Sequence, residues 1–127
     1  MATFAALWLL APATASAQGC TQSQLDGDFA MVCTSAFGNS KGLYVDKVGV
    51  AADIFEGHSC NGKFAAWAEL PNGKMWRKRG DAKCGFGRVW VNFSAKTKFK
   101  DGAKLCGAII TPRGHIRPEH ASIEIHK

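Results

Sequence analysis

Apolar and polar residues alternate with a period of two along much of this chain, a pattern typical of strands with one buried face. In segment 88–93, Val89, Val91 and Phe93 make one apolar face, and segment 122–126 alternates in the same way. Strands with one apolar and one polar face are typical of antiparallel sheets that cover a core. The alternation therefore indicates sheets with one side in water.

Turn-forming residues divide the chain into many short segments of this kind. The predicted strands are 28–33, 42–48, 50–55, 63–70, 74–78, 87–93, 105–110 and 121–126. A short helical turn is expected from Thr21 to Asp26, and no helical periodicity follows it. The fold class predicted is all-β, a small antiparallel β-sandwich or barrel.

One hairpin is predicted in detail, at Asn72-Gly73. Both residues tolerate positive φ, which suits a two-residue loop, so segments 63–70 and 74–78 would pair antiparallel across it. The expected cross-strand pairs are Leu70 with Met75, Glu69 with Trp76, and Trp67 with Lys78. The two tryptophans would then share one face of the sheet.

The N-terminal segment differs from the rest. Residues 3–16 carry no charge, 4–10 are apolar, and Ala15-Ser16-Ala17 supplies the small residues of a signal-peptidase site. The apolar run is shorter than the roughly 20 residues that span a membrane. Although no Lys or Arg precedes it, we expect residues 1–17 to be a cleaved secretory signal and residues 18–127 to form a single secreted, extracellular domain.

Five cysteines follow the expected cleavage site: Cys20, Cys33, Cys60, Cys84 and Cys106. None forms a Cys-x-x-Cys pair, which argues against a zinc ribbon or a thioredoxin-type motif. An odd number allows at most two internal bridges. The remaining thiol would be free, buried, or used to join two chains.

Several motifs share a resemblance to known proteins. They are Asn61-Gly62, the runs at 87–93 and 102–106, and the closing segment 122–127. Together they resemble small secreted disulfide-bonded β-proteins of actinobacteria and fungi, to which no activity is assigned. In such proteins a cysteine often precedes the last strand, where this chain has Pro118 to Ala121. The resemblance therefore implies the bridges Cys20–Cys33 and Cys60–Cys84, with Cys106 unpaired.

Positive charge is concentrated in one part of the chain. Residues 74–117 hold twelve Lys or Arg against two Asp, whereas the whole chain has a net charge of +6. Lys96, Lys98 and Lys100 alternate with other residues and would form one cationic row on a strand. Such a row would attract phosphates, sulfated sugars or an anionic cell envelope, or would simply be a solvated strand edge.

Aromatic residues lie among these charges. A surface that stacks on sugars or bases could be formed by Trp67, Trp76 and Trp90, with Arg77, Lys78 and Arg88 nearby in sequence. Trp67 and Trp76 are the better candidates. Trp90 lies between two valines, which is more typical of a core or sheet-surface residue than of a ligand platform.

Candidate catalytic groups are scattered. They are His58 with Glu56, and His115, Glu119, His120, Glu124 and His126 near the C-terminus. A histidine beside a carboxylate suits acid–base hydrolysis of phosphodiesters, but no spacing matches a nuclease signature. Pro118 interrupts any helical pair of metal ligands. We therefore expect no catalytic residue, metal or cofactor.

These observations favour a secreted, non-enzymatic binding or effector protein that contacts an anionic surface, a polysaccharide or a foreign protein. A secreted antimicrobial or toxin-like protein is the second interpretation. A small secreted hydrolase such as a ribonuclease is the third. No second apolar segment is long enough to span a membrane once the signal is removed.

Overall fold

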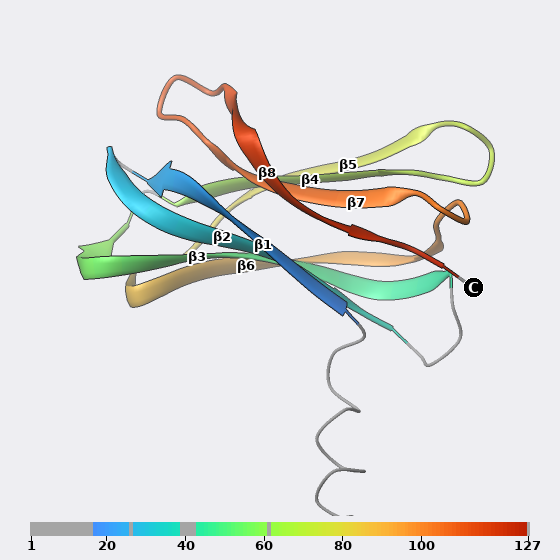
Figure 1. Cartoon of the computed structure of the whole chain (residues 1–127), viewed down its shortest axis with the longest axis horizontal. Coiled ribbons are helices and arrows are strands. Elements are labelled where there is room, and N and C mark those ends of the chain that lie inside the picture. Colours follow the sequence, from blue (N-terminus) through green and yellow to red (C-terminus); the bar gives the residue numbers. More distant parts are fainter. Residues whose placement is uncertain (1–16, 26, 39–42, 61, 127) are drawn as a thin grey trace, which may run out of the picture.

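Two antiparallel four-stranded sheets pack face to face in the part of the chain that the structure describes (Figure 1). The structure is a computed structural model that describes residues 17–25, 27–38, 43–60 and 62–126. Sheet A has the order β1 (Ala17–Leu25), β2 (Asp28–Phe37), β3 (Tyr44–Ser59) and β6 (Gly85–Lys98). Sheet B has the order β5 (Met75–Asp81), β4 (Lys63–Glu69), β7 (Lys104–Ile110) and β8 (Ile116–Glu124). The predicted antiparallel β-sandwich is confirmed, whereas the predicted signal segment lies outside the described residues apart from Ala17.

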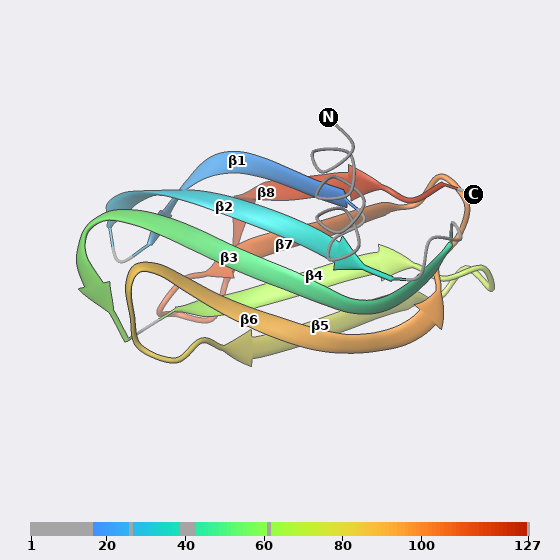
Figure 2. The ribbon, with the colours of Figure 1, turned by 90° about the horizontal axis from the view of Figure 1, so that it is seen from below.

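The core lies between the two sheets, because each strand points alternate side chains inward. The largest fully buried side chains are Phe64, Phe99, Leu105, Ile109, Val32, Val48, Val50 and Val89. They come from both sheets, so the inner face of each sheet is buried by the side chains of the other sheet. At about 25 cal/mol per Å² of apolar surface removed from water, this layer is the main stabilising contribution to the fold. Figure 2 shows the sandwich from the side of sheet A, with sheet B behind it.

Two sequence predictions for sheet A are corrected. The helical turn predicted from Thr21 is wrong, because Ser23 and Leu25 are buried and Gln24 between them is exposed, which is the alternation of strand β1. The two strands predicted on either side of Gly49 are one strand, β3. Gly49 stays in register with both neighbouring strands, so the ladder is not interrupted there.

The hairpin between β4 and β5 forms where it was predicted, but its turn has three residues and not two. Gly73 N donates to Leu70 O at 2.9 Å, and Leu70 N donates to Lys74 O at 2.8 Å, so residues 71–73 form the loop. Gly73 has φ +86°, and Asn72 is not among the residues with positive φ. Pro71 explains the difference, because its ring sets the φ angle that the second position of a type I turn requires. A residue with positive φ then completes this kind of loop.

The extra loop residue shifts the register of the hairpin by one. The observed pairs are Glu69 with Met75, Ala68 with Trp76, Trp67 with Arg77 and Ala66 with Lys78. A slip of one residue moves a strand's side chains to the opposite face of the sheet. The predicted shared face of Trp67 and Trp76 is therefore wrong: the two rings point to opposite sides of sheet B.

Both disulfides join facing positions of neighbouring antiparallel strands. Cys20 of β1 is bonded to Cys33, its register partner on β2. Cys60 is bonded to Cys84, one step beyond the last pair of the β3–β6 ladder. These are the two pairs that the sequence resemblance implied, and Cys106 is free and buried. Each bridge closes a loop in the unfolded chain, which lowers its entropy and stabilises the fold.

The two sheets approach closely where β7 and β8 cross sheet A. Thr34 Oγ1 is buried and donates to Ala121 O at 2.9 Å, which links β2 to β8. Gly107 of β7 lies over the same threonine, and a Cβ atom added there would be 2.3 Å from Thr34 Oγ1. Glycine is required at this position because the two sheets leave no room for a side chain. The outer faces of the sheets are left free on opposite sides of the molecule.

Candidate binding site

The outer face of sheet A carries the most exposed aromatic side chains of the described residues. Because Val89 and Val91 point inward, Trp90 between them points outward and is 56% exposed. The register places Trp90 beside Ala51 of β3, in line with Cys33 of β2. The sequence did hold this signal, since two inward valines require the residue between them to face water.

A shallow hollow of about 320 Å³ lies in this face. Its floor consists of small residues from β2 and β3, namely Ser35, Gly49 and Ala51. Phe37 and Trp90 line it as aromatic side chains. A Cβ atom on Gly49 would lie 2.9 Å from Asn92 Oδ1 and 3.3 Å from Phe37 Cε2, so the absence of a side chain there keeps the hollow open.

The polar groups of the hollow include amides and hydroxyls. Gln18 of β1 and Asn92 of β6 contribute side-chain amides, each with donors and an acceptor, and Ser35 adds a hydroxyl. Neighbouring strands hold these groups in place around the floor. The arrangement combines flat apolar surfaces with groups that both give and accept hydrogen bonds. It is suited to a neutral ligand that has hydroxyl groups.

The charge of Arg88 at this site is compensated by Asp53. Arg88 lines the hollow and forms a two-point ion pair with Asp53, with Nη2 donating to Oδ2 at 3.1 Å. The hydrogen bond and the charge of Asp53 raise the pKa of the Arg88 guanidinium. Lys47 Nζ lies 5.3 Å from the centre of the Phe37 ring, within the range of a cation–π contact. The predicted binding residue Arg88 is thus at the candidate site, but its charge is held by a neighbouring carboxylate.

Further aromatic rings continue the same face toward the end of β3. Phe29 and Phe55 stack with their ring centres 5.4 Å apart, and both are exposed. Phe86, near the start of β6, is 81% exposed. Side chains of this size left in water are uncommon in clusters and mark interaction surfaces. Phe29, Phe55 and Phe86 therefore add exposed aromatic surface on the same face as the hollow, separated from Trp90 along the β3–β6 ladder by the Asp53–Arg88 pair.

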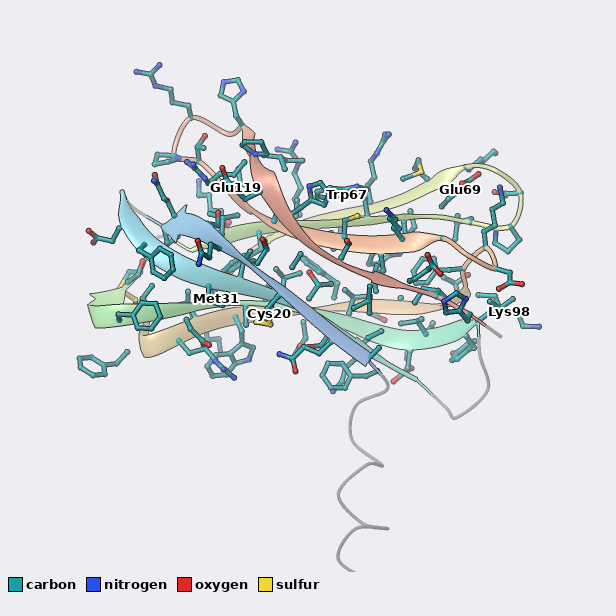
Figure 3. All side chains as sticks on the ribbon, viewed as in Figure 1. Cys20, Met31, Trp67, Glu69, Lys98 and Glu119 are labelled. Atoms are coloured by element: carbon teal, nitrogen blue, oxygen red, sulfur yellow. A yellow bond between two sulfur atoms is a disulfide. The ribbon has the colours of Figure 1, made fainter. Side chains whose placement is uncertain are left out.

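The two tryptophans predicted to form a binding pair lie on different surfaces. Trp76 packs edge-on against the buried ring of Phe99, with ring centres 5.4 Å apart, and is part of the sandwich interior. Trp67 lies on the outer side of sheet B, opposite to Cys20 on sheet A (Figure 3). It is half-buried and packs against the ring of His120, with the two ring centres 5.7 Å apart. Lys78 is exposed on the edge strand β5.

The three lysines predicted to form a cationic row are all exposed, but they do not form one free row. Lys96 has φ +49° and lies at a bulge in the β3–β6 ladder, and Lys98 ends β6. Lys100 lies beyond the strand, and its ammonium group is 3.4 Å from a carboxylate oxygen of Glu69 on sheet B. Whether these lysines bind a ligand stays a prediction.

The candidate acid–base residues do not gather at one place in the described part of the chain. His126 Nε2 is 2.7 Å from Glu124 Oε1, and both side chains are exposed. Glu119 accepts hydrogen bonds from Arg117 and Ser23. Among the described residues, no group of three or more metal-binding side chains occurs. His58 and Glu56 lie outside the residues whose side chains are described.

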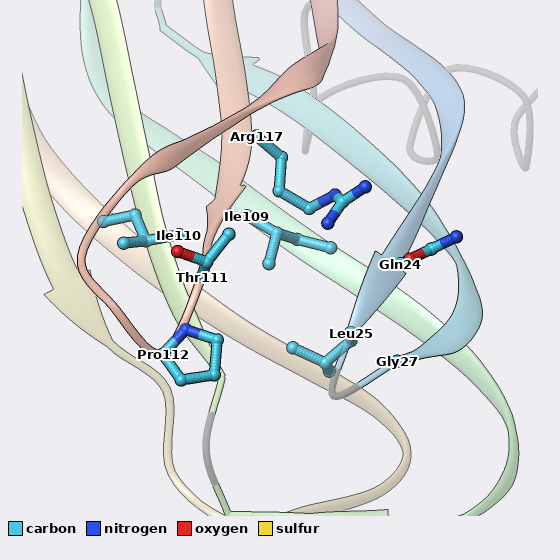
Figure 4. A pocket seen from close by; sticks show the side chains of 8 residues that line it. All are labelled: Gln24, Leu25, Gly27, Ile109, Ile110, Thr111, Pro112 and Arg117. Atoms are coloured by element: carbon cyan, nitrogen blue, oxygen red, sulfur yellow. The ribbon is translucent and has the colours of Figure 1, made fainter.

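A second hollow, of about 520 Å³, opens at the end of the sandwich between the β1–β2 turn and the β7–β8 turn (Figure 4). Its apolar lining comes from Leu25, Ile109 and Ile110, with Pro112 nearby. Arg117 reaches over it and is paired with Glu119, with Nε 2.8 Å from Oε1. This hydrogen bond lowers the pKa of Glu119. The guanidinium is thus held by a salt bridge within β8, and Ser23 of β1 donates a hydrogen bond to the same carboxylate oxygen at 3.3 Å.

Comparisons with protein families, with curated proteins and with solved structures find no match to this chain. In the described residues no helix is long and apolar enough to cross a membrane.

Proposed function

We propose that this protein is an extracellular, non-enzymatic binding protein that holds a polysaccharide on the outer face of sheet A. The observation that carries the proposal is the hollow between Trp90 and Phe37, with amides around a floor of small residues. The two disulfides are consistent with an extracellular protein, because such bonds persist outside the reducing cytosol.

The chemistry of the hollow fits a sugar ring. A sugar offers an apolar face of C–H groups, which lies well against an aromatic ring, and hydroxyl groups at its edge. Gln18, Ser35 and Asn92 supply donors and acceptors for those hydroxyls. Because Arg88, the charged residue that lines the hollow, is paired with Asp53, the hollow favours a neutral sugar over an acidic one.

The extent of the aromatic surface favours a polymer over a single sugar. Phe29 and Phe37 are the outward aromatic residues at the two ends of the β2 face, eight residues apart. At about 3.3 Å per residue this corresponds to roughly 26 Å. Trp90 lies between these ends on β6, and Phe55 lies beside Phe29 on β3. A linear chain running along the strands would contact several rings at once.

The test is co-sedimentation of the protein with insoluble cellulose, chitin and β-1,3-glucan, followed by titration with a soluble fragment of whichever polymer retains it. We expect Trp90→Ala to weaken binding about tenfold or more, equivalent to about 1.4 kcal/mol. Trp90 is exposed, so this change leaves the core intact.

The matched control is Arg77→Gln with Arg79→Gln, two exposed residues on the opposite sheet. This double variant is expected to bind the neutral polymer as the wild type does. If none of the three polymers retains the protein, or if Trp90→Ala binds as tightly as the wild type, the proposal is wrong.

A further inference from the structure

A second surface for a ligand lies on the outer face of sheet B, where the edge strand β5 carries two arginines. The register places Arg77 beside Trp67 and Arg79 beside Ala65, so these four residues share one face. Both arginines are exposed. The two-residue spacing along β5 keeps their guanidinium groups on the same side of the strand.

These residues line a groove of about 250 Å³. Ala65 is buried and forms a floor without a long side chain. Trp67 of β4 lies beside it, and Ile116 from the start of β8 lines the groove as well, although β8 is at the other edge of the sheet. Arg79 Nη1 donates to Gly114 O at 3.3 Å, which ties β5 to the β7–β8 turn and holds the guanidinium near the groove.

The charge of these two arginines is not neutralised within the described residues. No carboxylate of that part of the chain forms an ion pair with Arg77 or Arg79. Three carboxylates at other positions of sheet B are occupied: Glu69 pairs with Lys100, Glu119 with Arg117 and Glu124 with His126. Asp81, at the end of β5, forms no ion pair with any of the described residues. Arg88 on sheet A differs, because Asp53 holds it. The groove therefore combines two available guanidinium groups with an apolar wall.

We propose that this groove binds the sulfate- or carboxylate-bearing sugars of an acidic polysaccharide. A guanidinium group donates two parallel hydrogen bonds to an oxyanion, which fits a sulfate or a carboxylate better than a lysine ammonium does. The ring of the same sugar lies against Trp67 and Ile116. This site does not depend on the proposed function, because it uses the other sheet and other residues.

A nucleic acid fits the groove less well. Proteins that bind single strands offer several aromatic side chains on which successive bases stack. Trp67 is the one aromatic residue among the described residues that line this groove, and His120 already contacts its ring. Charge and one half-buried ring suit an acidic sugar better than a run of bases.

Heparin, a densely sulfated polysaccharide, is the probe. The wild-type protein should bind a heparin column and elute at a defined salt concentration, whereas Arg77→Gln with Arg79→Gln should elute at clearly lower salt. The slope of log affinity against log salt should fall by about one to two, because each neutralised anion releases a counterion. Arg77→Lys with Arg79→Lys keeps the charge but loses the two-point contact, so it should elute between the two.

The matched control is Lys96→Gln with Lys98→Gln, which removes the same charge from sheet A. It should elute close to the wild type, and unchanged thermal unfolding should show that all variants are folded. Equal shifts for the two double variants would mean that net charge alone acts, and the proposal would be wrong. Binding to single-stranded DNA that is tighter than to heparin, and lost with Arg77 and Arg79, would also overturn it.

Discussion

The two outer faces of this sandwich are built by the same alternation but present different chemistry. Sheet A presents Trp90, Phe55 and Phe86, with the charge of Arg88 cancelled by Asp53. Sheet B presents arginines on its edge strand and a half-buried Trp67. The core between them is shared, so the outward residues of each sheet are free to differ without altering the fold. One domain of this size therefore presents two faces of different chemistry, which we propose to be two separate binding surfaces.

Among the variants considered, removal of the disulfide in sheet A is expected to lower stability most. Cys33 lines the hollow near Trp90, and its bond to Cys20 holds the edge strand β1 that carries Gln18. Replacing both cysteines with serine should lower the free energy of unfolding by about 2–5 kcal/mol, measured by urea denaturation. Binding of the neutral polysaccharide should fall in the protein that stays folded.

Heparin elution of the same variant is the control, because the arginine groove on sheet B does not contact β1. We expect it to be unchanged. If heparin binding falls as much as binding of the neutral sugar, the two faces are not independent.

The second largest loss of stability is expected in the β4–β5 hairpin, which positions the arginines of β5. Gly73 has φ +86°, and a Cβ atom added there would meet no atom within 4 Å. Gly73→Val should nevertheless destabilise the protein by about 1 kcal/mol or more, because a β-branched residue resists positive φ. Thermal or urea unfolding measures this change.

Gly73→Asn is the control that separates the cost of a positive φ angle from the effect of adding a side chain. Asparagine adopts the left-handed region more easily than valine does. It should lose clearly less stability than the valine variant. Equal losses for valine and asparagine would mean that the left-handed backbone of the turn is not what glycine provides.

The sequence predicted the strands and the sandwich because a period of two is a local signal. The register of the hairpin was not predicted correctly, because Asn72-Gly73 is by itself a strong signal and Pro71 decides which turn forms. That one-residue slip also separated Trp67 from Trp76. A local pattern fixes which residues alternate, whereas the turn fixes which face each residue takes.

The candidate sites were predicted only in part. Arg88 does lie at the sheet A hollow, but its pairing with Asp53 depends on the alignment of β3 with β6, which are distant in sequence. Trp90 was interpreted as a core or sheet-surface residue, and it lies on the surface. Arg79 was counted only as charge, and Arg77 was grouped with the tryptophans only because it is near them in sequence. The place of both arginines on one face with Trp67 follows from the corrected register.

The smallest change in stability is expected for Glu119 of β8, which lies where β8 contacts β1 of the other sheet. Hydrogen bonding from Arg117 lowers the pKa of Glu119, so the fold favours its ionised form. The stabilisation is present above the ordinary value of 4.5 and is lost as the pH falls through the lowered pKa. Glu119→Gln should therefore lower the urea midpoint slightly at pH 7, and by less at an acidic pH below the lowered pKa, where the wild-type carboxyl takes up its proton. A gap of the same size at both pH values would contradict this account.

The most direct test of the central claim, that the two faces bind different polymers independently, is a bridging measurement. The protein is captured on immobilised heparin at low salt, and a soluble neutral glycan that binds the free protein is then titrated onto it. The captured protein should bind the glycan with the affinity of the free protein. Trp90→Ala should be captured as the wild type is but bind the glycan about tenfold more weakly or worse. Arg77→Gln with Arg79→Gln should be released from the heparin at clearly lower salt than the wild type. Loss of glycan binding by wild-type protein on heparin would show that the two polymers compete for one surface and would contradict the account.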